Sequence, residues 1–199
     1  MLVDGVSHTS TSERERVRAL VDQARRGDEE AFGALVRAVG GRCIFIAHRI
    51  LRDADLAEDA VQVALVQAWR ELPTLRDLDR FEAWLHRILV NACYAEARNR
   101  RRMGANVVLL ETDEPTATDG YLTVHDRDQL DRGFRRLPAE QRAVLVFHYA
   151  LGLTMPEVAE RLGIPLGTAK SRLSYAITAI RAALEADART PILDQENLA

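Results

Sequence analysis

The sequence predicts an all-α protein with two small helical domains joined by a flexible linker, and a helix-turn-helix in the C-terminal domain. Apolar side chains recur at helical spacing along most of the 199 residues, and no stretch alternates in the manner of a β-strand. Only 11 glycines and 6 prolines interrupt the Ala-, Leu-, Arg- and Glu-rich segments, a composition that favours helix. The periodicity stops over residues 103–126, a stretch longer than most loops within a compact domain.

Four helices are predicted in the first half of the chain, over residues 13–26, 29–51, about 54–72 and 80–102. Residues 1–12 lack periodicity and are expected to form a flexible arm. Gly27 is suited to end the first helix, and Asp28 can cap the second. Asp53 or Asp55 is expected to cap the third. The glycine pair at 40–41 predicts a kink or close packing in the second helix.

In the second half, helices are expected over residues 127–136 and 138–151, followed by the stretch "TMPEVAERLGIPLGTAKSRLSYAITAIR" at 154–181. Thr154 and Glu157 have the spacing of a capping box, which predicts a helix beginning at residue 155. Gly163 is suited to a left-handed helix end, and Pro165 prevents the first helix from continuing. This stretch therefore predicts two short helices joined by a tight turn.

The second helix of this pair presents a polar and basic side. Its exposed candidates are Thr168, Lys170, Ser171, Arg172, Ser174 and Tyr175. In a helix-turn-helix this helix lies in the major groove, where Arg172 can pair with the O6 and N7 atoms of guanine. The alternative is an ordinary helical hairpin whose polar side faces water.

Charge is segregated along the chain, although the formal net charge is only −3. Residues 80–102 carry six arginines and two glutamates, and residues 166–181 carry three basic residues and no acid. Residues 111–131 carry seven acids and one arginine. Phosphate binding follows local patches rather than the total charge, so the two basic segments favour nucleic-acid binding.

The predicted helix over 80–102 combines aromatic rings with cations. Trp84 and Tyr94 lie at helical spacings from Arg87, Asn91 and Arg98. Such a mixture suits single-stranded DNA, because unstacked bases offer ring faces and the backbone is anionic. The alternative is that Trp84, like Phe81, belongs to the core.

The predicted third helix has an acidic and polar side formed by Asp55, Glu58, Asp59 and Gln62. Two interpretations are open. Carboxylates near a helix N-terminus stabilise the helix dipole and commonly face water. The same side can instead dock a protein partner.

Several classes of protein are disfavoured by the sequence. Cys43 and Cys93 lie far apart in apolar surroundings, so reduced, buried thiols are expected and a metal site is not. The sequence shows no nucleophile–base pair, metal cluster or phosphate-binding loop, so neither an enzyme nor a cofactor is expected. The first residues lack the apolar core of a signal peptide, and no run reaches the ~18 apolar residues of a membrane span. A cytoplasmic protein is expected, without a membrane partner or small-molecule substrate.

Four segments in this order carry a resemblance to a known family: "AEDAVQ", "FEAWLHRILVNACYAEARNRRR", "LPAEQRAVLVFHYALGLTMPEVAERLG" and "GTAKSRL". The chain resembles bacterial RNA polymerase sigma factors of the extracytoplasmic-function (ECF) group over roughly residues 18–185. The resemblance implies a flexible arm (1–17), a core-binding and promoter-melting domain (18–102), an acidic linker (103–126), a promoter-reading helix-turn-helix domain (127–186) and a tail (187–199).

The resemblance also implies roles for individual residues. The surface that docks on the coiled coil of the polymerase's largest subunit corresponds to Asp55, Glu58, Asp59 and Gln62. The segment that captures a flipped base of the minus-10 element corresponds to Leu75, Arg76, Asp77 and Arg80. The helix used against the opening duplex corresponds to Trp84, Arg87, Asn91, Tyr94, Arg98 and Arg101. The minus-35 reader corresponds to Thr168, Lys170, Ser171, Arg172, Ser174 and Tyr175.

On the same grounds, the expected partners are core RNA polymerase, through its largest-subunit coiled coil and its flap, promoter DNA in duplex and single-stranded form, and an anti-sigma factor. The acidic linker is then expected to mimic DNA, resting against the basic helices or in the polymerase's cationic channel. The chain departs from many relatives in having "LRDLDR" in the capture loop and "SYA" after "GTAKSRL". The captured base and the recognised promoter sequence therefore do not carry over.

Two other functions are open from the residues alone. A stand-alone helix-turn-helix regulator would bind a palindromic duplex without polymerase, but it leaves "AEDAVQ" and the Trp/Arg-rich helix unexplained. A helical adaptor that binds only protein would tolerate loss of Arg172 without any effect on DNA.

Overall fold

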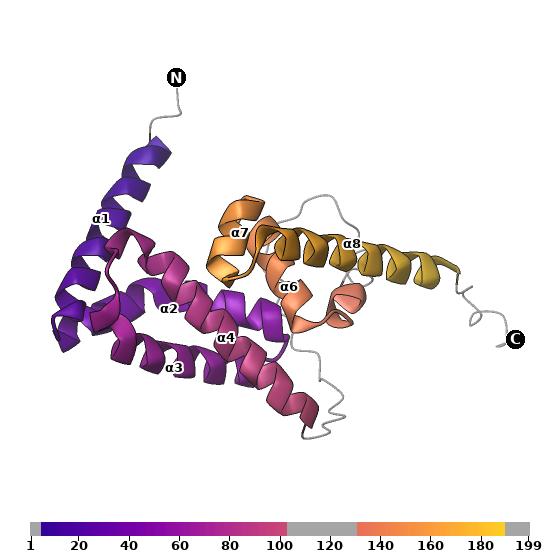
Figure 1. Cartoon of the computed structure of the whole chain (residues 1–199), viewed down its shortest axis with the longest axis horizontal. Coiled ribbons are helices and arrows are strands. Elements are labelled where there is room, and N and C mark those ends of the chain that lie inside the picture. The colour runs from indigo at the N-terminus through magenta and orange to yellow at the C-terminus, as the bar shows by residue number, and fades with distance from the viewer. Residues whose placement is uncertain (1–4, 103–130, 190–199) are drawn as a thin grey trace, which may run out of the picture.

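The computed structural model describes residues 5–102 and 131–189, and every regular element in these two ranges is helical (Figure 1). The first range contains α1 (Gly5–Arg25), α2 (Glu29–Leu51), α3 (Ala54–Glu71), η1 (Leu72–Thr74), η2 (Leu78–Arg80) and α4 (Phe81–Arg102). The second contains a helical turn over 131–135, then α6 (Ala139–Leu145), η3 (Val146–Ala150), α7 (Met155–Leu162) and α8 (Leu166–Arg189). The all-α prediction is confirmed, while the predicted linker lies outside the described residues.

Helices α1 to α4 form one bundle, in which α3 packs against both α2 and α4, and α1 packs against α2 at a large angle (Figure 1). The interior is filled by fully buried aliphatic side chains such as Leu35, Ile46, Ile50 and Leu89. These positions repeat at helical spacing, so burial of one apolar side of each helix stabilises the bundle.

The predicted caps of the first bundle are present. The carboxylate of Asp28 accepts a hydrogen bond from the Ala31 amide at 2.9 Å, and that of Asp53 accepts one from the Leu56 amide at 3.0 Å. Asp53, rather than Asp55, is therefore the cap of α3. Close packing at the glycine pair 40–41 was the wrong expectation, because α2 is continuous there and an added Cβ would meet nothing within 4 Å.

The second set of helices begins after Pro138. The predicted helix over 138–151 is observed as α6 followed by the π-helical turn η3. At the start of α7, the Glu157 carboxylate accepts hydrogen bonds from the Thr154 backbone amide (2.8 Å) and hydroxyl (2.6 Å). Gly163 ends α7 with φ = 65°, a conformation that glycine adopts without strain. The two predicted helices and their turn are thus confirmed.

The two sets of helices lie against each other. Helix α7 packs on α4, and α6 packs on α2 and α4. Phe147 is fully buried, and its ring meets the ring of His86 edge-on at 5.3 Å between centroids. We call this shared contact region of α2, α4, α6, α7 and α8 the junction. A single apolar cluster runs across it from one set of helices to the other.

Two boundaries differ from the sequence prediction. Helix α1 begins at Gly5, inside the predicted arm, and α8 extends to Arg189, inside the predicted tail. Helix α2 has the length and a mean hydropathy (1.3) that would suffice for a membrane span, although no such apolar run was predicted. Because α2 supplies buried side chains to the bundle core, its composition fits a core helix.

Candidate polymerase and nucleic-acid interfaces

The predicted docking surface lies on one exposed side of α3. Asp55, Glu58, Asp59 and Gln62 are all exposed, and Asp55 lies in the first turn. The neighbouring Asp53 is instead occupied by the helix cap and by an ion pair with Arg100 at 3.0 Å. The four predicted residues are therefore together and available to a partner.

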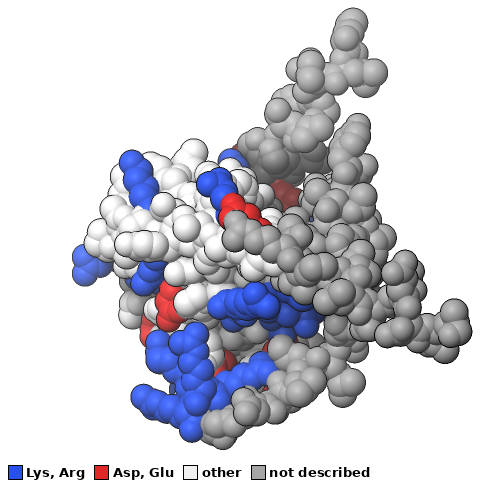
Figure 2. All heavy atoms as spheres, turned by 90° about the vertical axis from the view of Figure 1, so that its right-hand side faces the viewer, with Lys and Arg blue, Asp and Glu red and all other residues white. Residues whose placement is uncertain are grey.

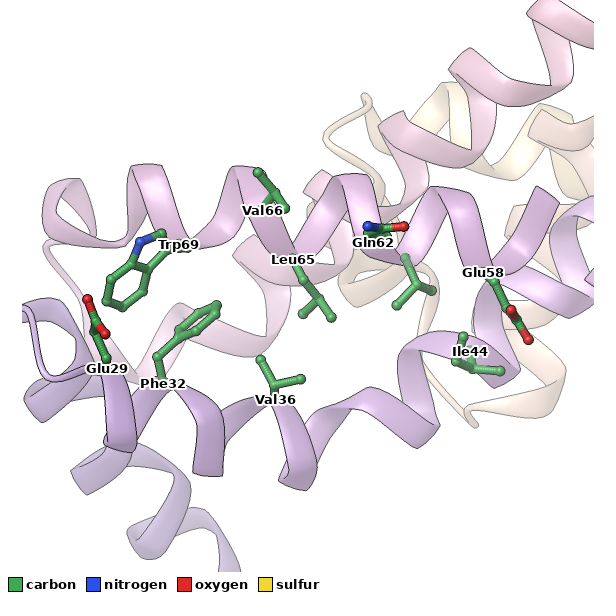
Figure 3. A pocket seen from close by; sticks show the side chains of 10 residues that line it. Glu29, Phe32, Val36, Ile44, Glu58, Gln62, Leu65, Val66 and Trp69 are labelled. Atoms are coloured by element: carbon green, nitrogen blue, oxygen red, sulfur yellow. The ribbon is translucent and has the colours of Figure 1, made fainter. Parts of the chain in front are cut away.

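An apolar groove between α2 and α3 adjoins this acidic surface (Figure 3). It has a volume of about 520 Å³ and is lined by Glu29, Phe32, Val36, Ile44, Glu58, Val61, Gln62, Leu65, Val66 and Trp69. The rings of Phe32 and Trp69 pack at 4.7 Å between centroids, and Val66 is 45% exposed. Glu58 and Gln62 belong to both surfaces, so the acidic side and the groove are continuous.

Sequence reasoning missed this groove. The available signal was Val66, an apolar residue outside the buried side of α3 that is exposed and lines the groove. Exposed aliphatic side chains that cluster beside polar ones are typical of interaction surfaces.

The predicted capture loop has a mixed environment. Leu75 is buried, and its carbonyl accepts a hydrogen bond from Arg25 at 3.2 Å. Asp77 caps the η2 turn, accepting from the Asp79 amide at 3.0 Å. Arg76 is exposed, and Arg80 forms an exposed ion pair with Glu160 of α7 at 2.7 Å.

Along α4 the predicted residues separate into exposed and partly buried groups. The exposed ones are Arg87, Asn91, Arg98 and Arg101. Trp84 is half-buried beside the Phe81 ring at 5.9 Å between centroids, so it packs on the core and keeps part of its surface accessible. Helix α4 ends in three arginines, and Lys and Arg side chains gather on the lower part of the face seen in Figure 2.

On α8, four of the six predicted reader residues are exposed: Lys170, Ser171, Ser174 and Tyr175. The Ser171 hydroxyl donates to the carbonyls of Gly167 and Thr168 at 3.0 and 3.1 Å. Thr168 and Arg172 are half-buried.

Arg172 turns toward Tyr94 of α4, so the two predicted promoter surfaces meet at this point. The Tyr94 hydroxyl and the Arg172 Nη1 atom are buried, and neither has a hydrogen-bond partner among the described residues. Burial raises the pKa of Tyr94 above its ordinary value, while the Arg172 charge opposes the rise. Tyr94 therefore stays neutral, with its buried hydroxyl beside the guanidinium of Arg172.

Arg161 of α7 is the centre of a polar contact that the sequence did not indicate. Its guanidinium donates to Nδ1 of the buried His86 at 2.9 Å and to the Glu82 carboxylate at 3.3 Å. Glu82 also accepts from Arg42 of α2 at 2.6 Å. Burial, followed by the charge of Arg161, lowers the pKa of His86 to about 4, so the ring is neutral and its Nδ1 lone pair can accept.

The two cysteines and the acidic and histidine side chains form neither a reactive thiol nor a metal site among the described residues. Cys43 and Cys93 are free thiols, as expected, and burial raises their pKa values to about 11 and about 12. Over residues 5–102 and 131–189 there is no group of three metal-ligating side chains.

Comparisons with known proteins agree with the resemblance. Residues 35–103 match the family model of sigma-70 region 2, and residues 127–180 match that of sigma-70 region 4. The ECF RNA polymerase sigma factor SigM of Mycobacterium tuberculosis is 35% identical over 150 residues, covering 75% of each chain. The RNA polymerase sigma-H factor of Pseudomonas aeruginosa is 28% identical over 184 residues, covering 86% of this chain and 95% of that protein.

Two solved structures are similar over most of this chain. CnrH, in complex with the cytosolic domain of CnrY, has a TM-score of 0.59 at 26% identity and covers 86% of this chain and 99% of its own. The sigma factor RpoE of Bartonella quintana, in complex with the anti-sigma factor NepR, has a TM-score of 0.59 at 27% identity and covers 78% and 98%.

Proposed function

This chain belongs to the extracytoplasmic-function group of RNA polymerase sigma factors, and on that premise we propose which of its surfaces meet the polymerase and which meet the promoter. As an alternative sigma factor it serves transcription initiation. Sigma factors are not themselves enzymes, so the chemistry belongs to core RNA polymerase. ECF sigma factors are soluble transcription factors, and we place this one in the cytoplasm with the polymerase.

The polymerase docks on the acidic side of α3, formed by Asp55, Glu58, Asp59 and Gln62, and on the adjoining groove. The observation that carries this assignment is the continuity of exposed carboxylates with an apolar groove. An apolar groove supplies most of the affinity of a protein interface, and charges at its edge orient the partner. A basic, amphipathic coiled coil fits both properties. The alternative, a stand-alone DNA-binding regulator, does not explain an exposed protein-docking surface of this kind.

The promoter meets α4 and its preceding loop at the minus-10 element, and α8 at the minus-35 element. Exposed Arg87, Asn91 and Arg98 lie on the α4 side suited to the opening duplex. Lys170 and Arg172 belong to a helix-turn-helix whose cap, left-handed glycine and second helix have the expected geometry. The corresponding division is a melting domain over 18–102 and a reading domain over 127–186, joined by the acidic linker.

An anti-sigma protein is the proposed regulatory partner. The support comes from RpoE of Bartonella quintana, which was solved together with its anti-sigma factor and resembles this chain over most of its length. The exposed groove and the acidic side of α3 are the surfaces that such a protein would need to cover to block polymerase binding.

Transcription with purified core polymerase from a related bacterium tests the proposal. The protein is added to fragmented genomic DNA and the 5′ ends of the RNA are mapped. A discrete set of starts that share two upstream elements is expected. Asp59→Arg should abolish these starts, whereas Glu13→Arg, an exposed acid of α1, should retain them. If core polymerase that works with its housekeeping factor gives no starts, the docking proposal fails, and binding to duplex DNA without polymerase would favour the stand-alone regulator.

A further inference from the structure

Four arginines meet where α2 and α4 end against α6. Arg52 directly follows α2, Arg100 and Arg101 lie in the last turn of α4, and Arg142 lies on α6, which packs on both other helices. We call these four residues the arginine cluster. Only Arg101 among them was predicted to meet promoter DNA. We propose that the arginine cluster is a binding site for a small anion that carries two linked phosphate groups.

Two members of the cluster are held in place by ion pairs. The Arg52 side chain is only 8% exposed and pairs with Asp131. Arg100 pairs with Asp53 at 3.0 Å, and both of these side chains are largely buried. Because Asp53 directly follows Arg52 in the chain, these pairs bring the ends of α2 and α4 together with their guanidinium groups nearby.

The backbone of Arg52 is unusual for an arginine. Its φ of 58° is left-handed, and every other described residue with φ in that region is a glycine. Helices commonly end in this conformation, but with glycine or asparagine, because a larger side chain is strained there. Strained backbone of this kind tends to occur at functional sites. An arginine is therefore kept at this helix end for its side chain.

The cluster lacks negative charge. Arg142 is close to the other three members, and burial, followed by the charges of Arg52, Arg101 and Arg100, lowers its pKa to about 10, so it stays protonated at neutral pH. Its Nε atom is buried and has no hydrogen-bond partner. The charged groups in and around the cluster are the four arginines and Arg135, with the carboxylates of Asp53, Asp131 and Glu140. Two positive charges remain after each carboxylate is set against one guanidinium.

A small phosphate compound fits this surplus better than a DNA backbone does. Guanidinium groups donate paired hydrogen bonds to phosphate oxygens, and two linked phosphates can meet guanidinium groups from both α4 and α6. Arg101 is exposed, whereas Arg100 and Arg142 are half-buried. A backbone phosphate carries a sugar on each side, so a duplex can reach Arg101 but is too bulky to reach the half-buried members. A small anion can reach all three.

Two substitutions distinguish a specific site from general screening of positive charge. Arg142→Met removes a cation of the cluster, keeps much of the side-chain volume, and should weaken binding of pyrophosphate at least tenfold, as for loss of charge-assisted hydrogen bonds. It also relieves repulsion among cations, so it should raise the midpoint of thermal unfolding in the absence of anion. The control Arg70→Ala removes an exposed arginine in the last turn of α3, at the opposite end of that helix from Asp53.

Pyrophosphate is titrated calorimetrically into the full-length protein at constant ionic strength, without divalent metal ions, and thermal unfolding is followed with and without it. The wild-type protein and Arg70→Ala should bind it saturably and unfold at a higher temperature in its presence, since a ligand that binds only the folded state stabilises that state. In Arg142→Met the rise should be much smaller. Sulfate, which carries a single tetrahedral group, should bind the wild-type protein at least tenfold more weakly than pyrophosphate.

Absence of saturable pyrophosphate binding, or an equal affinity in Arg142→Met and Arg70→Ala, would overturn the proposal. Sulfate binding as tight as that of pyrophosphate would contradict a ligand with two phosphates. A short random-sequence duplex is titrated in parallel, because DNA is the other source of phosphate. If Arg142→Met weakens duplex binding but not pyrophosphate binding, the cluster belongs to the DNA backbone instead. The pyrophosphate titration contains neither polymerase nor promoter, so its failure would leave the proposed function untouched.

Discussion

Protonation of His86 is expected to weaken the contact between α4 and α7. The imidazole is 2% exposed and accepts a hydrogen bond from Arg161 through Nδ1, which requires the neutral ring. The charged groups around it are Arg161 of α7, Glu82 of α4 and Arg42 of α2. Adding a proton would place a third cation beside the two arginines, with Glu82 as the compensating charge.

The size of the effect follows from the lowered pKa. The pKa of His86 falls from 6.5 to about 4 because of burial and the Arg161 charge. A difference of this size corresponds to about 3 kcal/mol between the two protonation states. The pKa of His86 is lower in the folded than in the unfolded protein, so the neutral ring contributes this amount to the free energy of unfolding. The contribution is fully present above pH 6.5 and is lost as the pH falls toward 4. At pH 5.5 the free energy of unfolding should already be about 1 kcal/mol lower than at neutral pH because of His86.

The assay is the free energy of unfolding by urea at pH 7.5, 5.5 and 4.5 for the wild-type protein and for His86→Asn. The Asn side-chain oxygen can accept from Arg161 in place of Nδ1 but does not titrate. Carboxylates elsewhere affect both proteins equally, so the difference between them isolates His86. The wild-type protein should lose about 1 kcal/mol more than the variant between pH 7.5 and 5.5. Equal losses would refute the assignment of a neutral, hydrogen-bonded His86.

Two further substitutions test the groove and the turn. Val66→Arg places an unpaired charge in the apolar groove and should weaken polymerase binding at least tenfold in a fluorescence titration or pull-down. The control is Gln67→Arg, at the next position but outside the lining of the groove. An equal loss of binding in both variants would argue against the groove as a docking site. Gly163→Ala should lower stability by about 1 kcal/mol in thermal unfolding, since φ is 65° there, whereas Gly167→Ala within α8 should raise it by up to about 1 kcal/mol. The reverse order would contradict the observed end of α7.

Local features of the fold were predictable from the sequence because their causes are local. Asp28 and Asp53 cap helices through amides three residues away, and Gly163 ends α7 through its own backbone freedom. The exposed side of α3 followed from helical spacing in the same way. The start of α1 was missed because its first turns lack apolar periodicity, the only signal available there.

The junction was not predictable, since its residues are distant in sequence. Arg161 and His86 are separated by 75 positions, and each has an ordinary local explanation, as a helix-surface arginine and as one residue of a helical stripe. The groove was predictable only in part. Val66 indicated an apolar patch on the exposed side of α3, but the opposing wall comes from Phe32 and Val36 of α2. Only packing of α2 on α3 reveals that the apolar residues face one another.

The two proposed interfaces lie on different parts of the fold. The acidic side of α3 and the groove beside it are exposed, and α3 packs against α2 and α4 on the side of the bundle away from α7 and α8 (Figure 1). A polymerase coiled coil can therefore bind α3 without disturbing the junction. The contact that we propose between Arg172 and promoter DNA would instead require this side chain to leave Tyr94, so promoter binding, unlike docking on α3, competes with the contact between α4 and α8.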